Sequence, residues 1–187
     1  MTEQKFLPGR LEDVLNQCLE DGEKPAVLVI DMQKTNYDPA FNENQYPWQV
    51  IQRQQELLSY AKQEGLPVIV VELHFGSLEP HSTLPELSQL VKGYPYASLL
   101  KKPWYSSFEK TDLEISLRRK KISTLLLMGQ KSYCCVLDTA RDARSLGFQV
   151  ITAPTVLIPF VDTPSYSKNC SLFYSKNCKF YDDKAPL

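Results

Sequence analysis

The sequence is short of several features that point to particular classes of protein. Its 187 residues contain 7 glycines, and none of these forms a Gly-x-Gly-x-x-Gly or phosphate-binding loop. No apolar run approaches the roughly 18 residues of a membrane span, and residues 1–10 lack the apolar core of a secretion signal. The net charge is −1, which gives no electrostatic reason to bind nucleic acid. We therefore expect neither nucleic-acid nor membrane partners.

Cysteine and histidine are also sparse. The five cysteines are an odd number and include no Cys-x-x-Cys pair, so we expect reduced thiols and a cytoplasmic protein rather than a disulfide framework. The remaining composition is ordinary, with 43% hydrophobic and 23% charged residues. This length suits a single domain over 1–187, with an N-terminal helical extension (1–24) and a C-terminal helical tail (160–187).

Hydrophobic patterning predicts the fold class. Short apolar runs at 26–30, 67–73, 123–129 and 148–153 are typical of strands buried on both faces, and 156–160 is a candidate short fifth strand. Amphipathic helical patterns at 50–61, 112–120 and 133–146 alternate with them, after a first helix at 11–19. The stretch 74–108 has no regular pattern beyond a short helix near 84–91. The alternation predicts an α/β fold, a doubly wound parallel sheet of five to six strands with helices on both faces.

Ligands of such sheets bind beyond the carboxyl ends of the strands, so the residues found there are the candidates for chemistry. Asp31 follows the first strand, and Cys134 and Cys135 follow the third at the start of a helix. A helix start lowers the pKa of a thiol. Taken alone, each has a simpler explanation, because such an Asp is commonly a turn residue and such a Cys a small buried one.

Three segments carry a family resemblance: AVLVIDMQ (26–33), KPWYSSF-x-x-T-x-L (102–113) and G-x-x-S-x-x-CV-x-x-TARDAxxxGF (129–148). In order and spacing the chain resembles the isochorismatase-like cysteine hydrolases, which include nicotinamidases, N-carbamoylsarcosine amidohydrolases and ureidoacrylate amidohydrolases. The resemblance implies a catalytic triad of Asp31, Lys102 and Cys135. It also implies an oxyanion hole from the backbone N–H groups of Cys134 and Cys135, and a cis peptide at Gln130–Lys131.

The implied reaction is hydrolysis of a small carboxamide or ureido compound through a thioester, with release of ammonia. A thiolate is a strong nucleophile near neutral pH, Lys102 can stabilise it, and Asp31 can carry the proton. We expect Cys135 to have the lowered pKa and Cys134 to be sheltered and slow to react. The expected substrate pocket combines residues around these positions: Gln33, Tyr37, His74, Trp104, Tyr105 and Tyr133.

A cofactor and an assembly follow from the same resemblance. Nicotinamidases bind a divalent metal such as zinc where this chain has Glu72, His74 and His81, but Glu replaces their usual Asp, and we expect no cofactor. Family members usually form oligomers, so we expect a homo-oligomer (a dimer or larger) that uses the aromatic-rich segment 93–108.

Three alternatives stay open at this point. An isochorismatase-type vinyl-ether hydrolase frequently lacks cysteine at the thiol position, so Cys135 argues against it. A non-catalytic family member that acts as an interaction protein would not need the intact triad. A redox protein that uses Cys134 and Cys135 as a pair would need the strained disulfide of adjacent cysteines.

Overall fold

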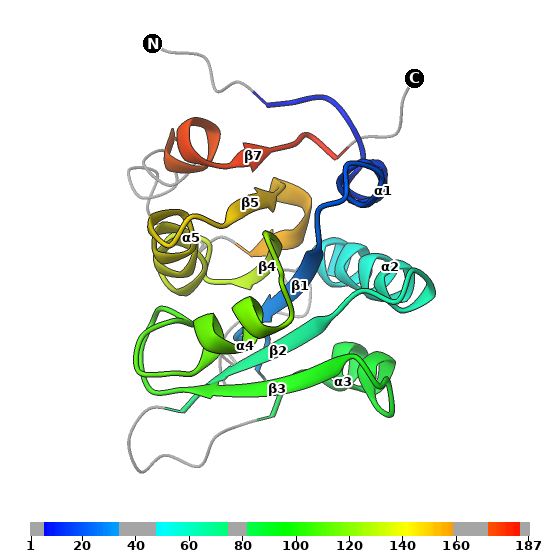
Figure 1. Cartoon of the computed structure of the whole chain (residues 1–187). Helices are drawn as coiled ribbons and strands as arrows, with labels where there is room; N and C mark the ends of the chain where they lie inside the picture. Colours follow the sequence, from blue (N-terminus) through cyan, green and yellow to red (C-terminus); the bar gives the residue numbers. More distant parts are fainter. Residues whose placement is uncertain (1–5, 34–47, 75–81, 159–171, 184–187) are drawn as a thin grey trace.

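The computed structural model describes residues 6–33, 48–74, 82–158 and 172–183. Its elements run along the chain in the following order: α1 (Leu11–Glu20), β1 (Pro25–Ile30), α2 (Trp48–Gln63), β2 (Val68–Leu73), α3 (Pro85–Val91), β3 (Ala97–Lys102), α4 (Leu113–Arg119), β4 (Thr124–Gln130), α5 (Cys135–Ser145), β5 (Gln149–Thr152), a 3-10 turn (Pro154–Val156), β6 (Leu157–Ile158) and β7 (Lys179–Phe180). A further helical turn covers 172–177. Figure 1 shows the strands as one twisted sheet through the middle of the molecule.

The sheet is parallel throughout, with the strand order β3-β2-β1-β4-β5-β7 and with β6 paired to β4. Every residue of the central strands β1 and β4 is buried, which is why both read as uninterrupted apolar runs in the sequence. The predicted α/β fold with a parallel sheet is confirmed. The two-residue strands β6 and β7 bring the described sheet to seven strands, beyond the five to six expected.

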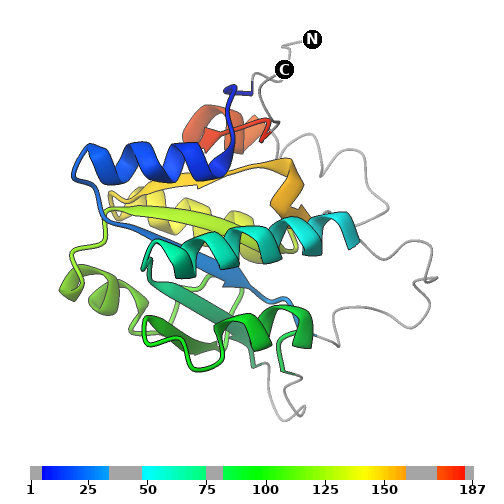
Figure 2. The same ribbon diagram turned by 90° about the vertical axis from the view of Figure 1, so that its right-hand side faces the viewer.

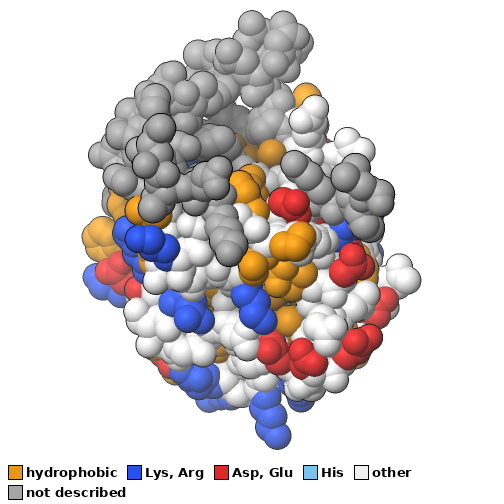
Figure 3. Space-filling view, turned by 90° about the horizontal axis from the view of Figure 1, so that it is seen from above, with side chains coloured by type: hydrophobic (Ala, Val, Ile, Leu, Met, Phe, Trp, Pro, Cys, Tyr) orange, Lys and Arg blue, Asp and Glu red, His pale blue; other side chains and the backbone are white. Residues whose placement is uncertain are grey.

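Helices cover both faces of the sheet. The helices α1, α2 and α3 lie side by side on one face, whereas α4 and α5 lie on the other (Figures 1 and 2). The apolar side of α1 faces the protein interior, where Leu11 and Leu15 are completely buried. Seen from above, the molecule carries both acidic and basic side chains, with apolar side chains exposed between them (Figure 3). Within the described ranges, no helix combines the length and apolar composition that crossing a membrane requires.

Two strands are absent from the sequence-based prediction, and the reason is physical. β3 lies at the edge of the sheet, so Ser98, Leu99 and Lys101 are exposed and the strand has no continuous apolar run. β7 contains two residues, too few for any periodicity. The predicted helical tail is helical at 172–177 but extended at 179–180. Most of the rest of 160–187 lies outside the described residues.

Candidate active site

The ends of three parallel strands, β1, β3 and β4, bring the candidate catalytic residues together. Asp31 directly follows β1, Lys102 is the last residue of β3, and Cys135 begins α5 beyond the end of β4. The register places the end of β2 between the first two, since Ile30 pairs with Val71 and Leu73 pairs with Lys102. The sheet therefore collects at one edge three residues that are up to 104 positions apart in sequence.

Asp31 and Lys102 form a buried ion pair. The Lys102 Nζ lies 2.8 Å from the Asp31 Oδ2, and the two side chains are 0% and 2% exposed. Lys102 also donates a hydrogen bond to the backbone carbonyl of Tyr105, so its charge is directed inward rather than to solvent. Burial raises the pKa of Asp31, opposed by the charge of Lys102 and by a hydrogen bond from the Cys135 thiol. The carboxylate is thus placed between a cation and a thiol.

The two thiols at the start of α5 differ from the sequence-based expectation. Cys135 is 6% exposed, whereas Cys134 is only half-buried. The hydrogen bond with Cys134, burial and the neighbouring Asp31 together raise the pKa of Cys135. The same hydrogen bond from Cys135 lowers the pKa of Cys134 to about 7, and Lys102 and Lys131 act in the same direction. The expectation of a sheltered Cys134 and an acidic Cys135 is therefore wrong, because the hydrogen bond with Cys134 and burial beside a carboxylate together outweigh the helix terminus.

At rest, the S–H group of Cys135 has two acceptors, the Cys134 sulfur and the Asp31 carboxylate. This arrangement differs from a preformed thiolate stabilised by lysine. The Asp31 carboxylate can accept the proton of that thiol, and Lys102 balances the charge of the carboxylate.

The turn that leads to Cys135 is held by close backbone contacts. Gly129 adopts φ +134°, and a Cβ atom there would lie 2.1 Å from the Ile30 carbonyl oxygen, so only glycine fits. The next peptide, Gln130–Lys131, is cis, at the position that the resemblance implies. The N–H of Cys134 donates to the Lys131 carbonyl at 3.0 Å. That hydrogen bond engages one of the two expected oxyanion donors within the turn, and leaves the Cys135 N–H as the candidate.

A second contact joins the Lys102 segment to the Cys135 helix. The N–H of Ser107 donates to Thr139 Oγ1 at 2.9 Å, and Ser106 Oγ donates to Asp142 Oδ2 at 2.5 Å. These residues belong to two of the segments that carry the resemblance, 102–113 and 129–148. The pairing of the segments was not part of the sequence prediction, because hydroxyl contacts across 32 or 36 positions leave no periodic signal.

The expected pocket residues separate into different roles. Gln33 is buried and its amide faces the end of β2, where Nε2 donates to the Leu73 carbonyl at 3.2 Å and Oε1 accepts from the Leu73 N–H at 2.8 Å. The structure shows this supporting role for Gln33, and its expected role in lining the pocket stays a prediction. Trp104 and Tyr105 are exposed residues directly after Lys102, and Tyr133 is half-buried before the thiols. Their contact with substrate stays a prediction, and Tyr37 lies outside the described residues.

A metal site at Glu72 and His74 is not completed by the described residues. Glu72 Oε1 accepts hydrogen bonds from the Thr83 N–H and hydroxyl, both at 2.8 Å, and Glu72 Oε2 lies 3.5 Å from His74 Nε2. His81 lies outside the described residues, and the described ranges hold no cluster of three metal-ligating side chains. Catalytic zinc needs three protein ligands. We therefore derive no step through a metal.

Comparisons with known proteins agree with this geometry. The Isochorismatase domain profile matches residues 25–154, which include all three strand-end residues. The chain belongs to the isochorismatase family. Among curated isochorismatase family proteins of Bacillus subtilis, PncA is 38% identical over 66 residues, which cover 35% of this chain and about a third (36%) of PncA. YddQ is 27% identical over 130 residues, which cover 66% of this chain and 71% of YddQ.

Solved structures show the same fold at low sequence identity. Nicotinamidase PncA from Bacillus subtilis superposes with a TM-score of 0.73 at 22% identity, covering 84% of this chain and 99% of that chain. N-carbamoylsarcosine amidase from Thermoplasma acidophilum gives 0.71 at 19% identity, covering 87% and 98%. A putative isochorismatase-family hydrolase from Chromobacterium violaceum gives 0.73 at 23% identity, covering 96% and 94%. The three structures share the fold of this chain.

Proposed function

We propose that this family member is a cysteine amidohydrolase that cleaves a small carboxamide or ureido substrate and releases ammonia. The observation that carries the proposal is the buried group of three, in which the Asp31 carboxylate contacts both the Lys102 ammonium and the Cys135 thiol. The relationship to proteins described as nicotinamidase and N-carbamoylsarcosine amidase supports an amide as the bond that is cleaved.

The first half of the reaction uses Asp31 as the base. As the Cys135 sulfur attacks the substrate carbonyl carbon, its proton passes to the carboxylate, and the carbonyl π electrons move to oxygen. The Cys135 N–H at the start of α5 can donate to that developing oxyanion. When the carbonyl re-forms, the C–N bond breaks and the nitrogen takes the proton from Asp31, which leaves ammonia and a thioester.

The second half repeats these roles with water. Asp31 removes a proton from water as the oxygen attacks the thioester, and the C–S bond then breaks and the sulfur recovers that proton. Lys102 remains charged throughout, so the protonated and ionised forms of Asp31 exchange beside a fixed cation. The raised pKa of Asp31 suits this task, because a higher pKa makes the buried carboxylate a stronger base than one in water.

We also propose a cytoplasmic location for the protein. All four cysteines in the described part of the chain are free thiols, and a reaction through Cys135 requires that it stay reduced. This supports a cytoplasmic location. The alternative vinyl-ether chemistry does not need a thiol, and a non-catalytic role would not explain a buried charge pair against a cysteine.

The test is a panel of small amides assayed for ammonia release. The amides are nicotinamide, pyrazinamide and N-carbamoylsarcosine, and isochorismate is assayed separately for the release of pyruvate. We expect one or more amides to be hydrolysed, with activity abolished in Cys135→Ala and retained in Cys18→Ala, whose thiol is buried in α1. Pyruvate release without ammonia release, or full amide hydrolysis by Cys135→Ala, would overturn the proposal.

A further inference from the structure

Asp31 stands at the point where the pairing of β1 with β4 ends. The register runs to Ile30 opposite Gly129, so the next residues along the two strands, Asp31 and Gln130, lie beside each other beyond the ladder. Asp31 has φ 53°, in the left-handed region that residues other than glycine seldom adopt. Its backbone therefore needs support from its surroundings if its side chain is to keep one direction.

The Asp31 peptide groups are held on both sides. Its N–H donates to the Val71 carbonyl of β2 at 3.0 Å, which continues the β1–β2 ladder. Its carbonyl accepts from the N–H of Gln33, two residues further along the chain, at 2.8 Å, and from Nε2 of Gln130 at the end of β4 at 2.6 Å. The Gln130 contact is the shorter and links Asp31 to the strand that leads to Cys135.

We infer that Gln130 is a positioning residue for the reaction, because its side-chain amide fixes the backbone of Asp31 and so directs the Asp31 carboxylate at the Cys135 thiol. The inference rests on the proposed role of Asp31 as base. Gln130 is 3% exposed, and it is held from its other side by the pairing of β4 with β6 at Ile158. An apolar side chain of similar size can fill the same space but cannot donate to the carbonyl.

A matched control exists in the same chain. Gln54 of α2 is fully buried, and its Nε2 donates to the Val156 carbonyl at 2.8 Å. The variants Gln130→Met and Gln54→Met each remove one buried amide donor and leave one backbone carbonyl without it. Both are expected to lower the melting temperature, which reports folding, but only the first alters the surroundings of Asp31.

The primary readout is independent of any substrate. In a Cys134→Ser background, the rate of iodoacetamide alkylation of Cys135 is measured from pH 6 to pH 10. Beside the hydrogen bond with Cys134 and burial, the charge of Asp31 helps to raise the pKa of Cys135, so loosening Asp31 in Gln130→Met is expected to speed alkylation at pH 8 by about tenfold. Gln54→Met is expected to leave the profile unchanged. Equal profiles for both variants, or slower alkylation in Gln130→Met, would overturn the inference.

A second readout uses the amide substrate that the panel identifies. In Gln130→Met, kcat is expected to fall at least about tenfold with little change in KM, because Asp31 is misaligned in the proton transfer rather than in binding. In Gln130→Glu, hydrolysis relative to the parent should recover as pH falls, since a protonated carboxyl regains a donor for the Asp31 carbonyl. A pH-independent defect in Gln130→Glu counts against positioning. If no amide is cleaved, the proposed function fails while the alkylation result still tests Gln130.

Discussion

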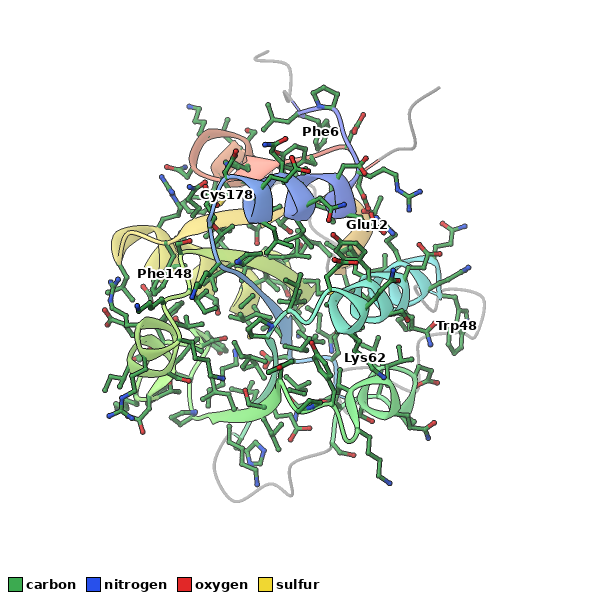
Figure 4. All side chains as sticks on the ribbon, turned by 45° about the vertical axis from the view of Figure 1, so that its right-hand side comes forward. Phe6, Glu12, Trp48, Lys62, Phe148 and Cys178 are labelled. Carbon is green, nitrogen blue, oxygen red and sulfur yellow. The ribbon has the colours of Figure 1, made fainter. Side chains whose placement is uncertain are left out.

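Removal of the Asp183 side chain should destabilise the protein by about 3 kcal/mol, although this residue lies near the C-terminus. Its carboxylate is completely buried and accepts from Arg53 Nε and Nη2, both at 2.7 Å, from Thr155 Oγ1 at 2.6 Å and from the Leu11 N–H at 3.0 Å. Arg53 also contacts both carboxylate oxygens of Glu12. Figure 4 shows Glu12 on α1 close to α2, the helix that carries Arg53.

The magnitude follows from what remains after Asp183→Ala. Breaking a buried ion pair costs about 3–5 kcal/mol, because the surviving charge is left buried without its partner. Arg53 keeps Glu12, so the lower end of this range applies. For a chain of this size, 1 kcal/mol corresponds to about 2–4 °C in melting temperature, so the variant should melt about 6–12 °C lower.

The matched control is Glu56→Ala. Glu56 pairs with the same guanidinium at 3.0 Å, but its side chain is 49% exposed, and such exposed pairs contribute about 0.5 kcal/mol or less. Urea unfolding of the two variants at pH 7 compares the free energies of unfolding directly. If Asp183→Ala loses less than about 1 kcal/mol, or no more than Glu56→Ala, the buried cluster does not stabilise the fold in the way described.

The same cluster makes the stability of the fold depend on pH. Burial raises the pKa of Asp183 and of Glu12, but the hydrogen bonds from Arg53 outweigh it, and both pKa values end below their ordinary values of 3.8 and 4.5. Below pH 5 the unfolded chain therefore binds more protons than the folded one, and this part of the stability is lost as pH falls. The difference between the parent and Asp183→Ala should shrink between pH 5 and pH 3 in urea titrations.

Three further outcomes are expected. Gly129→Ala should cost about 1–3 kcal/mol more than Gly93→Ala in urea unfolding, because both have positive φ but only Gly129 would clash with backbone. Iodoacetamide near pH 7 should label Cys134 before Cys135 by peptide mapping, and the reverse order would contradict the assigned pKa directions. We also propose a homo-oligomer through segment 93–108, where Tyr96 and Leu99 are exposed, and sedimentation as a monomer of about 21 kDa at micromolar concentration would refute it.

The strand ends that hold Asp31 and Cys135 could be located from the sequence because buried parallel strands leave a clear record. β1 and β4 are buried at every residue, so each is a run of apolar letters with a sharp end, and the site follows that end. Lys102 could not be located in this way. It ends the edge strand β3, whose exposed residues leave neither a continuous apolar run nor a regular alternation, and it came only from the KPWYSSF resemblance.

The ordering of the two thiols shows a different limit. The helix terminus that lowers the pKa of a thiol can be read from the sequence, but burial and a neighbouring carboxylate cannot. The hydrogen bond with the adjacent Cys134 and burial are the largest causes of the raised pKa of Cys135, and Asp31, 104 residues away in sequence, acts in the same direction. A pKa argument from local sequence holds only where no distant charge is brought into contact.

The support of Asp31 by Gln130 shows why the role of a buried glutamine is difficult to predict from the sequence. Where a parallel strand ends, its last N–H and C=O groups lose their ladder partners and must be satisfied from elsewhere. Gln33 does this for Leu73, and Gln130 does it for Asp31. A buried amide at a strand end looks the same in the sequence whether it serves backbone or substrate. Only the direction of the amide separates the two roles, and in both residues the amide donates to a backbone carbonyl.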